Sequence, residues 1–189
     1  VSRNRDVRGE DLVVMAQMTG LVKLNLSGCL YVSVSDVGYL RACRELRYLD
    51  VSRLIWMTDT RFLRDFPLLR SLNLNFNMCY DLTDISEQVN LVILNLGKCR
   101  TLSDISPLSC LFSLTDLNLS RTSVSDESLL GITSLTNLRS LNIGGCLLIS
   151  DKGISNLRNL KNLTYLNASG CHVTQKSQFF ITRANLKKM

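Results

Sequence analysis

The sequence predicts an α/β solenoid in which a curved parallel β-sheet lines the concave side and short helices or 3₁₀ turns line the convex side. Two observations predict it. A phrase with apolar residues at its first, fourth and sixth places recurs seven times in 189 residues. Each copy is followed by a hydroxyl residue, in most cases with an aspartate after it, and then by a second apolar series. A fixed period of this length is typical of repeats that stack and share one continuous core.

The seven copies of the phrase begin at evenly spaced leucines. These are Leu21, Leu46, Leu69, Leu91, Leu114, Leu138 and Leu163, at intervals of 25, 23, 22, 23, 24 and 25 residues. The copies read LVKLNLSGC, LRYLDVSRL, LRSLNLNFN, LVILNLGKC, LTDLNLSRT, LRSLNIGGC and LTYLNASGC. Side chains at the fourth and sixth places alternate along an extended chain, so both point to one face of a short strand. Each strand is therefore expected to pair in parallel with the strand of the next repeat.

The second half of each repeat carries an apolar residue followed by Ser or Thr and Asp, as in 124–126. Six repeats have this triplet, and the seventh, at 173–175, lacks only the acid. A hydroxyl followed by a carboxylate is typical of a helix N-terminus, where both offset the free N–H groups and the dipole. Apolar residues then recur every three positions, which favours a short α or 3₁₀ element. Gln88 interrupts this series, so the third coil is expected to be looser.

The same spacing continues at both ends of the chain. Leu12, Met15 and Met18 precede the first repeat by nine, six and three residues, and Leu186 starts the L-x-x-L frame again. We therefore expect a single domain over residues 1–189, with about seven full repeats, a partial repeat at each end, and a longer parent chain. Leu12, Met15 and Met18 are predicted to pack beneath the first strand.

The net charge of +6 is unevenly distributed along the chain. Residues 1–95 carry eleven basic and eleven acidic residues, whereas residues 96–189 carry eleven and five. Such an excess can attract an acidic partner or nucleic acid, although scattered charge more often forms a solvated face. The basic residues are not interleaved with stacking aromatics in the sequence, which disfavours nucleic acid.

Seven cysteines bear on the redox environment. Four hold the ninth place of their repeats, namely Cys29, Cys99, Cys146 and Cys171. Equivalent places along a solenoid favour buried structural thiols over zinc ligands, which need clusters such as C-x₂-C. Reduced thiols indicate an intracellular, cytoplasmic protein. Four N-x-[Ser/Thr] sites point to secretion instead, but three of them arise from the repeat phrase itself.

Catalytic signatures are missing from the sequence. It contains one histidine, His172, and no G-x-S-x-G, phosphate loop or paired carboxylates that would support nucleophilic or acid–base chemistry. It also contains no run of eighteen apolar residues. We therefore expect no enzyme activity, cofactor, metal, small-molecule substrate or membrane association.

These motifs resemble those of the leucine-rich-repeat superfamily over nearly the whole chain. The L-x-x-L-N-L-S-G-C phrase and its continuation at 149–154 resemble the cysteine-containing repeats of F-box substrate receptors and ribonuclease-inhibitor-like solenoids. The run at 102–120 resembles the shorter phosphatase-regulator type, and the mixture is similar to kinetoplastid leucine-rich-repeat proteins. The resemblance implies an intracellular protein-binding scaffold.

A partner is expected on the concave face, because the third, fifth and seventh places point away from the buried leucines. The fifth place is Asn in six repeats and Asp in one, a ladder best explained by amides bonding along the sheet. The third and eighth places vary and include Tyr, Arg and Phe, the residues that commonly anchor interfaces. The candidate partner-binding residues are Tyr48, Asp50, Arg53, Phe76, Asn95, Lys98, Asp116, Arg121 and Tyr165.

The function expected from the sequence is a non-enzymatic protein–protein interaction scaffold. Its partner, another protein with an acidic patch, would lie along the concave face and the edge where the strands end. One alternative is the substrate-recognition arm of an F-box-type ubiquitin ligase, which an F-box upstream of residue 1 would indicate. A nucleic-acid-binding module is a third reading, and a steep salt dependence of binding would be its mark.

Overall fold

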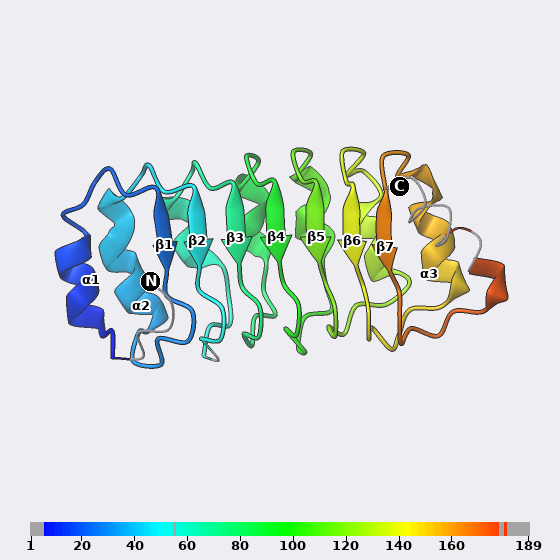
Figure 1. The fold of residues 1–189 in the computed structure, drawn as a ribbon, viewed down its shortest axis with the longest axis horizontal. Coiled ribbons are helices and arrows are strands. Elements are labelled where there is room, and N and C mark those ends of the chain that lie inside the picture. Colours follow the sequence, from blue (N-terminus) through cyan, green and yellow to red (C-terminus); the bar gives the residue numbers. More distant parts are fainter. Residues whose placement is uncertain (1–5, 55, 178–179, 181–189) are drawn as a thin grey trace.

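Seven parallel strands form one open sheet, in chain order, in the computed structural model (Figure 1), which describes residues 6–54, 56–177 and 180. The strands are β1 (Lys23–Asn25), β2 (Tyr48–Asp50), β3 (Ser71–Asn73), β4 (Ile93–Asn95), β5 (Asp116–Asn118), β6 (Ser140–Asn142) and β7 (Tyr165–Asn167). The fourth-place leucines pair with one another from coil to coil, beginning with Leu24 and Leu49. This confirms the predicted register. We number the coils 1 to 7 from the seven first-place leucines.

Short helical elements form the opposite, convex side, as the three-residue spacing predicts. They are α1 (Gly9–Met15), α2 (Val34–Val37), η1 (Gly38–Ala42), η2 (Arg61–Asp65), η3 (Thr83–Glu87), η4 (Ser106–Cys110), η5 (Ser128–Ile132), α3 (Asp151–Asn156) and η6 (Leu157–Asn159). Those labelled η are 3₁₀ turns, which place every third residue on one side. Leu129 and Ile132 on η5 are fully buried for this reason, and Leu135, three residues further on, is also fully buried. One core runs without interruption from Leu12 to Ala168.

The N-terminal end differs in part from expectation. Leu12 on α1 is fully buried and Met15 packs against the core, as predicted. Met18 is 58% exposed, because it follows the helix and lines a cavity of about 640 Å³ beside β1 instead of filling it. The backbone carbonyl of Met18 accepts a hydrogen bond from the Cys43 thiol at 3.5 Å. The predicted restart at Leu186 lies outside the described residues.

The Ser/Thr-Asp triplets cap helices less uniformly than predicted. Ser150 begins α3 as expected, and its hydroxyl accepts the Lys152 N–H at 3.2 Å. Ser35 does not cap α2; Ser33 does, in a reciprocal pair with the Asp36 carboxylate. Before η2 and η4 the triplet carboxylate acts alone: Asp59 Oδ1 accepts the Arg61 N–H at 3.1 Å, and Asp104 Oδ1 accepts the Ser106 N–H at 2.9 Å. Before η5 the Ser125 hydroxyl accepts the Ser128 N–H at 3.3 Å instead.

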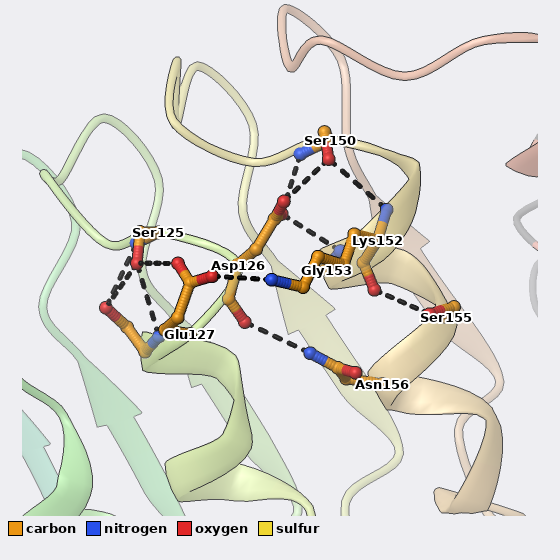
Figure 2. A network of polar contacts seen from close by, with 9 residues as sticks. Ser125, Asp126, Glu127, Ser150, Lys152, Gly153, Ser155 and Asn156 are labelled. Atoms are coloured by element: carbon orange, nitrogen blue, oxygen red, sulfur yellow. Dashed lines mark hydrogen bonds and ion pairs between the residues drawn. The ribbon is translucent and has the colours of Figure 1, made fainter.

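Asp126 holds the helix of the following coil (Figure 2). Its Oδ1 accepts the N–H groups of Ser150 at 2.8 Å and Gly153 at 2.9 Å, and its Oδ2 accepts the Ser150 hydroxyl. A Cβ on Gly153 would lie 2.2 Å from Asp126 Oδ1, so this contact requires glycine. Asp151 repeats the arrangement one coil later by accepting the N–H of Thr174 at 3.0 Å. The carboxylate of one coil thus fixes the convex segment of the next.

Candidate protein-binding face

The fifth-place ladder on the concave face is tied to the backbone. In all seven coils the Oδ1 atom accepts the N–H group two residues later, as Asp50 does from Ser52 at 2.9 Å and Asn95 from Gly97 at 3.1 Å. A side-chain bond along the ladder occurs between Asn73 and Asp50, at 2.9 Å. The sequence predicts amides that bond to each other and to water along the sheet. The structure adds that the Oδ1 atom of each fifth-place residue accepts a backbone N–H, because the strand end needs these oxygens to turn the chain.

This turn places every eighth residue in the left-handed conformation. Three coils use glycine there, Gly28, Gly145 and Gly170, with φ of 73°, 76° and 73°. The four central coils use Arg53, Phe76, Lys98 and Arg121, with φ of 62°, 62°, 63° and 57°. Left-handed backbone costs a residue with a Cβ roughly 1–2 kcal/mol and costs glycine almost nothing. The conformation is held by bonds to the next coil, such as Phe76 N–H to the Gly97 carbonyl at 2.9 Å.

The four side chains at these strained places point outward. Arg53 and Arg121 are exposed, and Phe76 is 46% exposed. The ammonium of Lys98 lies 5.8 Å from the Phe76 ring centroid, a cation–π contact. A Cβ added to Gly145 would lie 3.0 Å from Arg121 Cγ, so the Arg121 stem lies over the neighbouring coil.

The third places form the floor of the concave face. Tyr48 is 40% exposed and has the Lys23 ammonium 4.5 Å from its ring centroid. Asp116 Oδ2 accepts the Thr115 hydroxyl at 2.7 Å. Tyr165 lies on β7, two strands from Asp116 on β5 with β6 between them, so it is remote from the central group. The cavity beside β1 extends over this floor as far as Ile93 on β4.

Several exposed residues beside the candidates were missed by the sequence reasoning. Ile93 is 45% exposed on the floor, and Met78, Tyr80 and Arg100 are exposed just beyond the eighth place of coils 3 and 4. All four stand in the same repeat frame as the chosen residues. An apolar residue at a solvent-facing third place, and bulky residues at the tenth to twelfth places, would have identified them.

The cysteine ladder has a hydrogen-bonding role. The thiols of Cys99, Cys146 and Cys171 donate to the sixth-place carbonyl of the preceding coil, as Cys99 does to Leu74 at 3.2 Å and Cys146 to Leu119 at 3.1 Å. Cys171 bonds to Ile143 at 3.1 Å but is only partly buried, contrary to expectation, because it lies in coil 7 and no described strand follows that coil. Within the described residues, which include all seven cysteines, no disulfide forms.

Burial suppresses the reactivity of these thiols. It raises the pKa of Cys99 to about 11 and that of Cys79, which has no place in the ladder, to about 12. The thiolate is the reactive form, so a high pKa makes a cysteine inert near neutral pH. Cys110 at the end of η4 is exposed.

The part of the chain that the structure describes lacks metal-ligand clusters and membrane-spanning helices. It contains no group of three or more His, Cys, Asp or Glu side chains that could hold a metal ion. The His172 ring bonds through Nδ1 to the Leu147 carbonyl. No helix among the described residues is long and apolar enough to cross a membrane.

Comparison with solved structures shows a shared fold with three internalins of Listeria monocytogenes. Internalin F is 24% identical with a TM-score of 0.75, covering 90% of this chain and 48% of its own. Internalin C2 is 28% identical with a TM-score of 0.72, covering 84% and 66%. The functional domain of InlJ, which includes a cysteine ladder, is 23% identical with a TM-score of 0.66, covering 82% and 31%. The chain thus spans about half of the internalin F structure. Scans of protein-family profiles and of curated proteins returned no match.

Proposed function

The chain has the leucine-rich-repeat solenoid fold, and from this premise we propose that it is a non-enzymatic scaffold that binds another protein through its concave face and strand-exit edge. The observation that carries the proposal is the concave sheet itself. No helix of the described residues covers that side of the sheet (Figure 1). The sheet presents Tyr48 and Ile93, each at least 40% exposed, beside Phe76. Exposed bulky side chains on a rigid face favour protein recognition.

The proposed contact residues differ in the part that each can play. Phe76 is the apolar anchor, and Arg53, Lys98 and Arg121 face an acidic patch on the partner. Tyr48, Asp116 and Tyr165 extend the contact along the floor. Asp50 and Asn95 are held by backbone bonds and offer only their remaining polar atoms. Complementary charge of this kind contributes more to association rate and specificity than to affinity.

The proposal includes an intracellular setting. The ladder thiols of Cys99 and Cys146 donate hydrogen bonds inside the core, a role that requires them to stay reduced. Reducing compartments maintain thiols in that form.

Site-specific photo-crosslinking of the protein inside cells tests this function. A benzophenone amino acid replaces Tyr48, Asp116 or Tyr165 on the concave side, and Phe112 or Leu130 on the exposed convex side serves as the matched control. The expected result is one discrete cross-linked protein from the concave positions and none from the controls. Binding of the identified, purified protein is then measured by calorimetry. A partner that cross-links only when the benzophenone is at Phe112 or Leu130 would place the interface on the convex side, which would contradict the proposal.

A further inference from the structure

The strand-exit rim, which we define as the seventh to twelfth places of every repeat, has a one-sided charge. These places are residues 27–32, 52–57, 75–80, 97–102, 120–125, 144–149 and 169–174. They contain no Asp or Glu and four cations, Arg53, Lys98, Arg100 and Arg121. None of these cations forms an ion pair with a described carboxylate, whereas Arg61, Arg64 and Lys152 on the convex side each do. The rim therefore carries positive charge that the described part of the molecule does not neutralise.

The backbone at the eighth place shows that the fold itself has no need of these long side chains. Glycine meets the left-handed geometry without strain in coils 1, 6 and 7. In coils 2 to 5 the same geometry is imposed on Arg53, Phe76, Lys98 and Arg121. Strained positions of this kind concentrate at ligand-binding sites, because the surrounding structure holds them ready for a ligand. Their contacts within the chain lie at the surface: Lys98 lies over the half-exposed Phe76 ring, and the Arg121 stem lies over Gly145. Such contacts leave these side chains accessible to another molecule.

We propose that the rim of coils 2 to 5 binds an extended, acidic segment of the partner protein, an inference that rests on the proposed function. Neighbouring coils lie about 4.8 Å apart at the sheet, so three steps from Arg53 to Arg121 span about 14 Å. An extended peptide rises about 3.3 Å per residue, and some five residues cover that span. Carboxylates on the segment meet Arg53, Lys98 and Arg121. An apolar side chain between them rests on Phe76 and Met78 of coil 3, which are both about half exposed.

The concave floor argues for a peptide over a nucleic-acid strand. Asp50 and Asp116 stand on the floor strands beside the rim, on coils 2 and 5. A phosphodiester chain, charged at every residue, would be repelled wherever it left the rim for the floor. A peptide can confine its carboxylates to one side and turn apolar or basic side chains towards Ile93 and Asp116.

Fluorescence anisotropy with two matched variants tests the rim. The probe is a labelled peptide of about a dozen residues, rich in Glu and Asp with two central leucines; the same peptide with Gln and Asn is its control. The rim variant is Arg53→Gly/Lys98→Gly/Arg121→Gly, in which glycine suits the local φ and keeps the fold. The control variant is Arg41→Gln/Arg44→Gln/Arg158→Gln, which removes the same charge from exposed convex sites. An oligothymidylate of similar length is the third probe.

The expected result is binding of the acidic peptide alone, weakened at least about tenfold in the rim variant and less than about twofold in the control variant. Equal weakening in both variants, or no binding of the acidic peptide by the unaltered chain, overturns the rim proposal. Tighter binding of oligothymidylate that is lost in the rim variant overturns it in favour of a nucleic-acid site. Cross-linking from Tyr48 and Asp116 distinguishes a failure of the rim inference from a failure of the proposed scaffold function. If it persists undiminished in the rim variant, the scaffold stands and the rim inference fails.

Discussion

At the scale of single residues, folding stability and partner binding favour different residues at the eighth place of each coil. The turn that ends every strand demands a left-handed residue, and three coils meet that demand with glycine. In the other four coils a residue with a Cβ has this left-handed backbone, which is strained, and its side chain points outward. These residues are Arg53, Phe76, Lys98 and Arg121. Substitutions at this place should therefore move folding stability and binding in opposite directions.

Arg53→Gly is expected to raise the free energy of unfolding by about 0.5–1 kcal/mol, because relief of left-handed strain exceeds the added entropy of the unfolded chain. Gly145→Ala should lower it by about 1–2 kcal/mol, since the new Cβ would lie 3.0 Å from Arg121 Cγ at a φ of 76°. Urea denaturation measures both. Gly20→Ala is the control, because Gly20 has open space around it and should change little. Destabilisation by Arg53→Gly would refute the strain argument.

Phe76→Ala tests the anchor. It should weaken binding of the cross-linked partner by about 1–2 kcal/mol, while the free energy of unfolding changes by less than about 0.5 kcal/mol because the ring is half exposed. Calorimetry gives the first value and urea denaturation the second. Loss of stability without loss of affinity would mean that the ring merely shields coil 3.

At the scale of secondary-structure elements, the convex turn of coil 3 contains a buried defect. Gln88 is 1% exposed; its Nε2 donates to the Leu63 carbonyl at 2.9 Å, but its Oε1 has no hydrogen-bond partner among the described residues. The Leu63 carbonyl also accepts the Phe66 N–H, so it stays satisfied without Gln88. The expectation of a looser coil remains a prediction.

Gln88→Leu should raise the free energy of unfolding by about 1–2 kcal/mol, because it removes a buried acceptor that lacks a partner and restores the apolar series of the other coils. Differential scanning calorimetry of the variant and the parent checks this. A lower melting temperature would show that the amide bond to Leu63 matters more than the unpaired oxygen.

Leu117→Ala tests the strand layer of the core. The leucine is 2% exposed at the fourth place of β5, and its truncation should cost roughly 2–5 kcal/mol of unfolding free energy. Leu130 on η5 is 57% exposed, so Leu130→Ala provides a control of the same chemistry with an expected loss well below about 1 kcal/mol. Similar losses in the two variants would contradict the assigned faces.

The sequence was sufficient to predict the elements that depend on local alternation. Leu24 to Leu166 fall in register because every repeat carries the same two-residue pattern on its strand. It was insufficient wherever neighbouring coils decide the outcome. The exposure of Met18, the cap by Ser33 in place of Ser35, and the left-handed state of Arg53 all depend on contacts or bonds outside the local motif. The proposed site shares this property. Its third and eighth places could be named from variation, but the lack of ion pairs between the rim cations and described carboxylates appears only in the structure.

At the scale of the whole molecule, buried thiols couple stability to alkaline pH. Burial raises the pKa of Cys79 to about 12 and of Cys99 to about 11, from an ordinary value of 9.0. The unfolded chain releases these protons first, so this contribution is complete below about pH 9 and is lost as pH rises towards 11–12. The urea midpoint should fall from pH 8 to pH 10, and less so in a Cys79→Ala/Cys99→Ala variant. An identical fall in both proteins would assign the effect to other groups.

Asp126 and Asp151 each bond to the coil that follows their own, so the support between these coils runs from the N-terminal coil to the C-terminal one. Asp126 of coil 5 secures the start of α3 in coil 6, and Asp151 of coil 6 secures Thr174 in coil 7. Removal of coil 7 leaves the helix start of coil 6 intact, whereas opening of coil 5 deprives coil 6 of its support. Local opening in this half of the molecule should therefore spread towards the C-terminus more readily than towards the N-terminus. Amide hydrogen exchange would reveal this as an asymmetry: Asp126→Asn should speed exchange in coils 6 and 7 while coils 3 and 4 keep their protection.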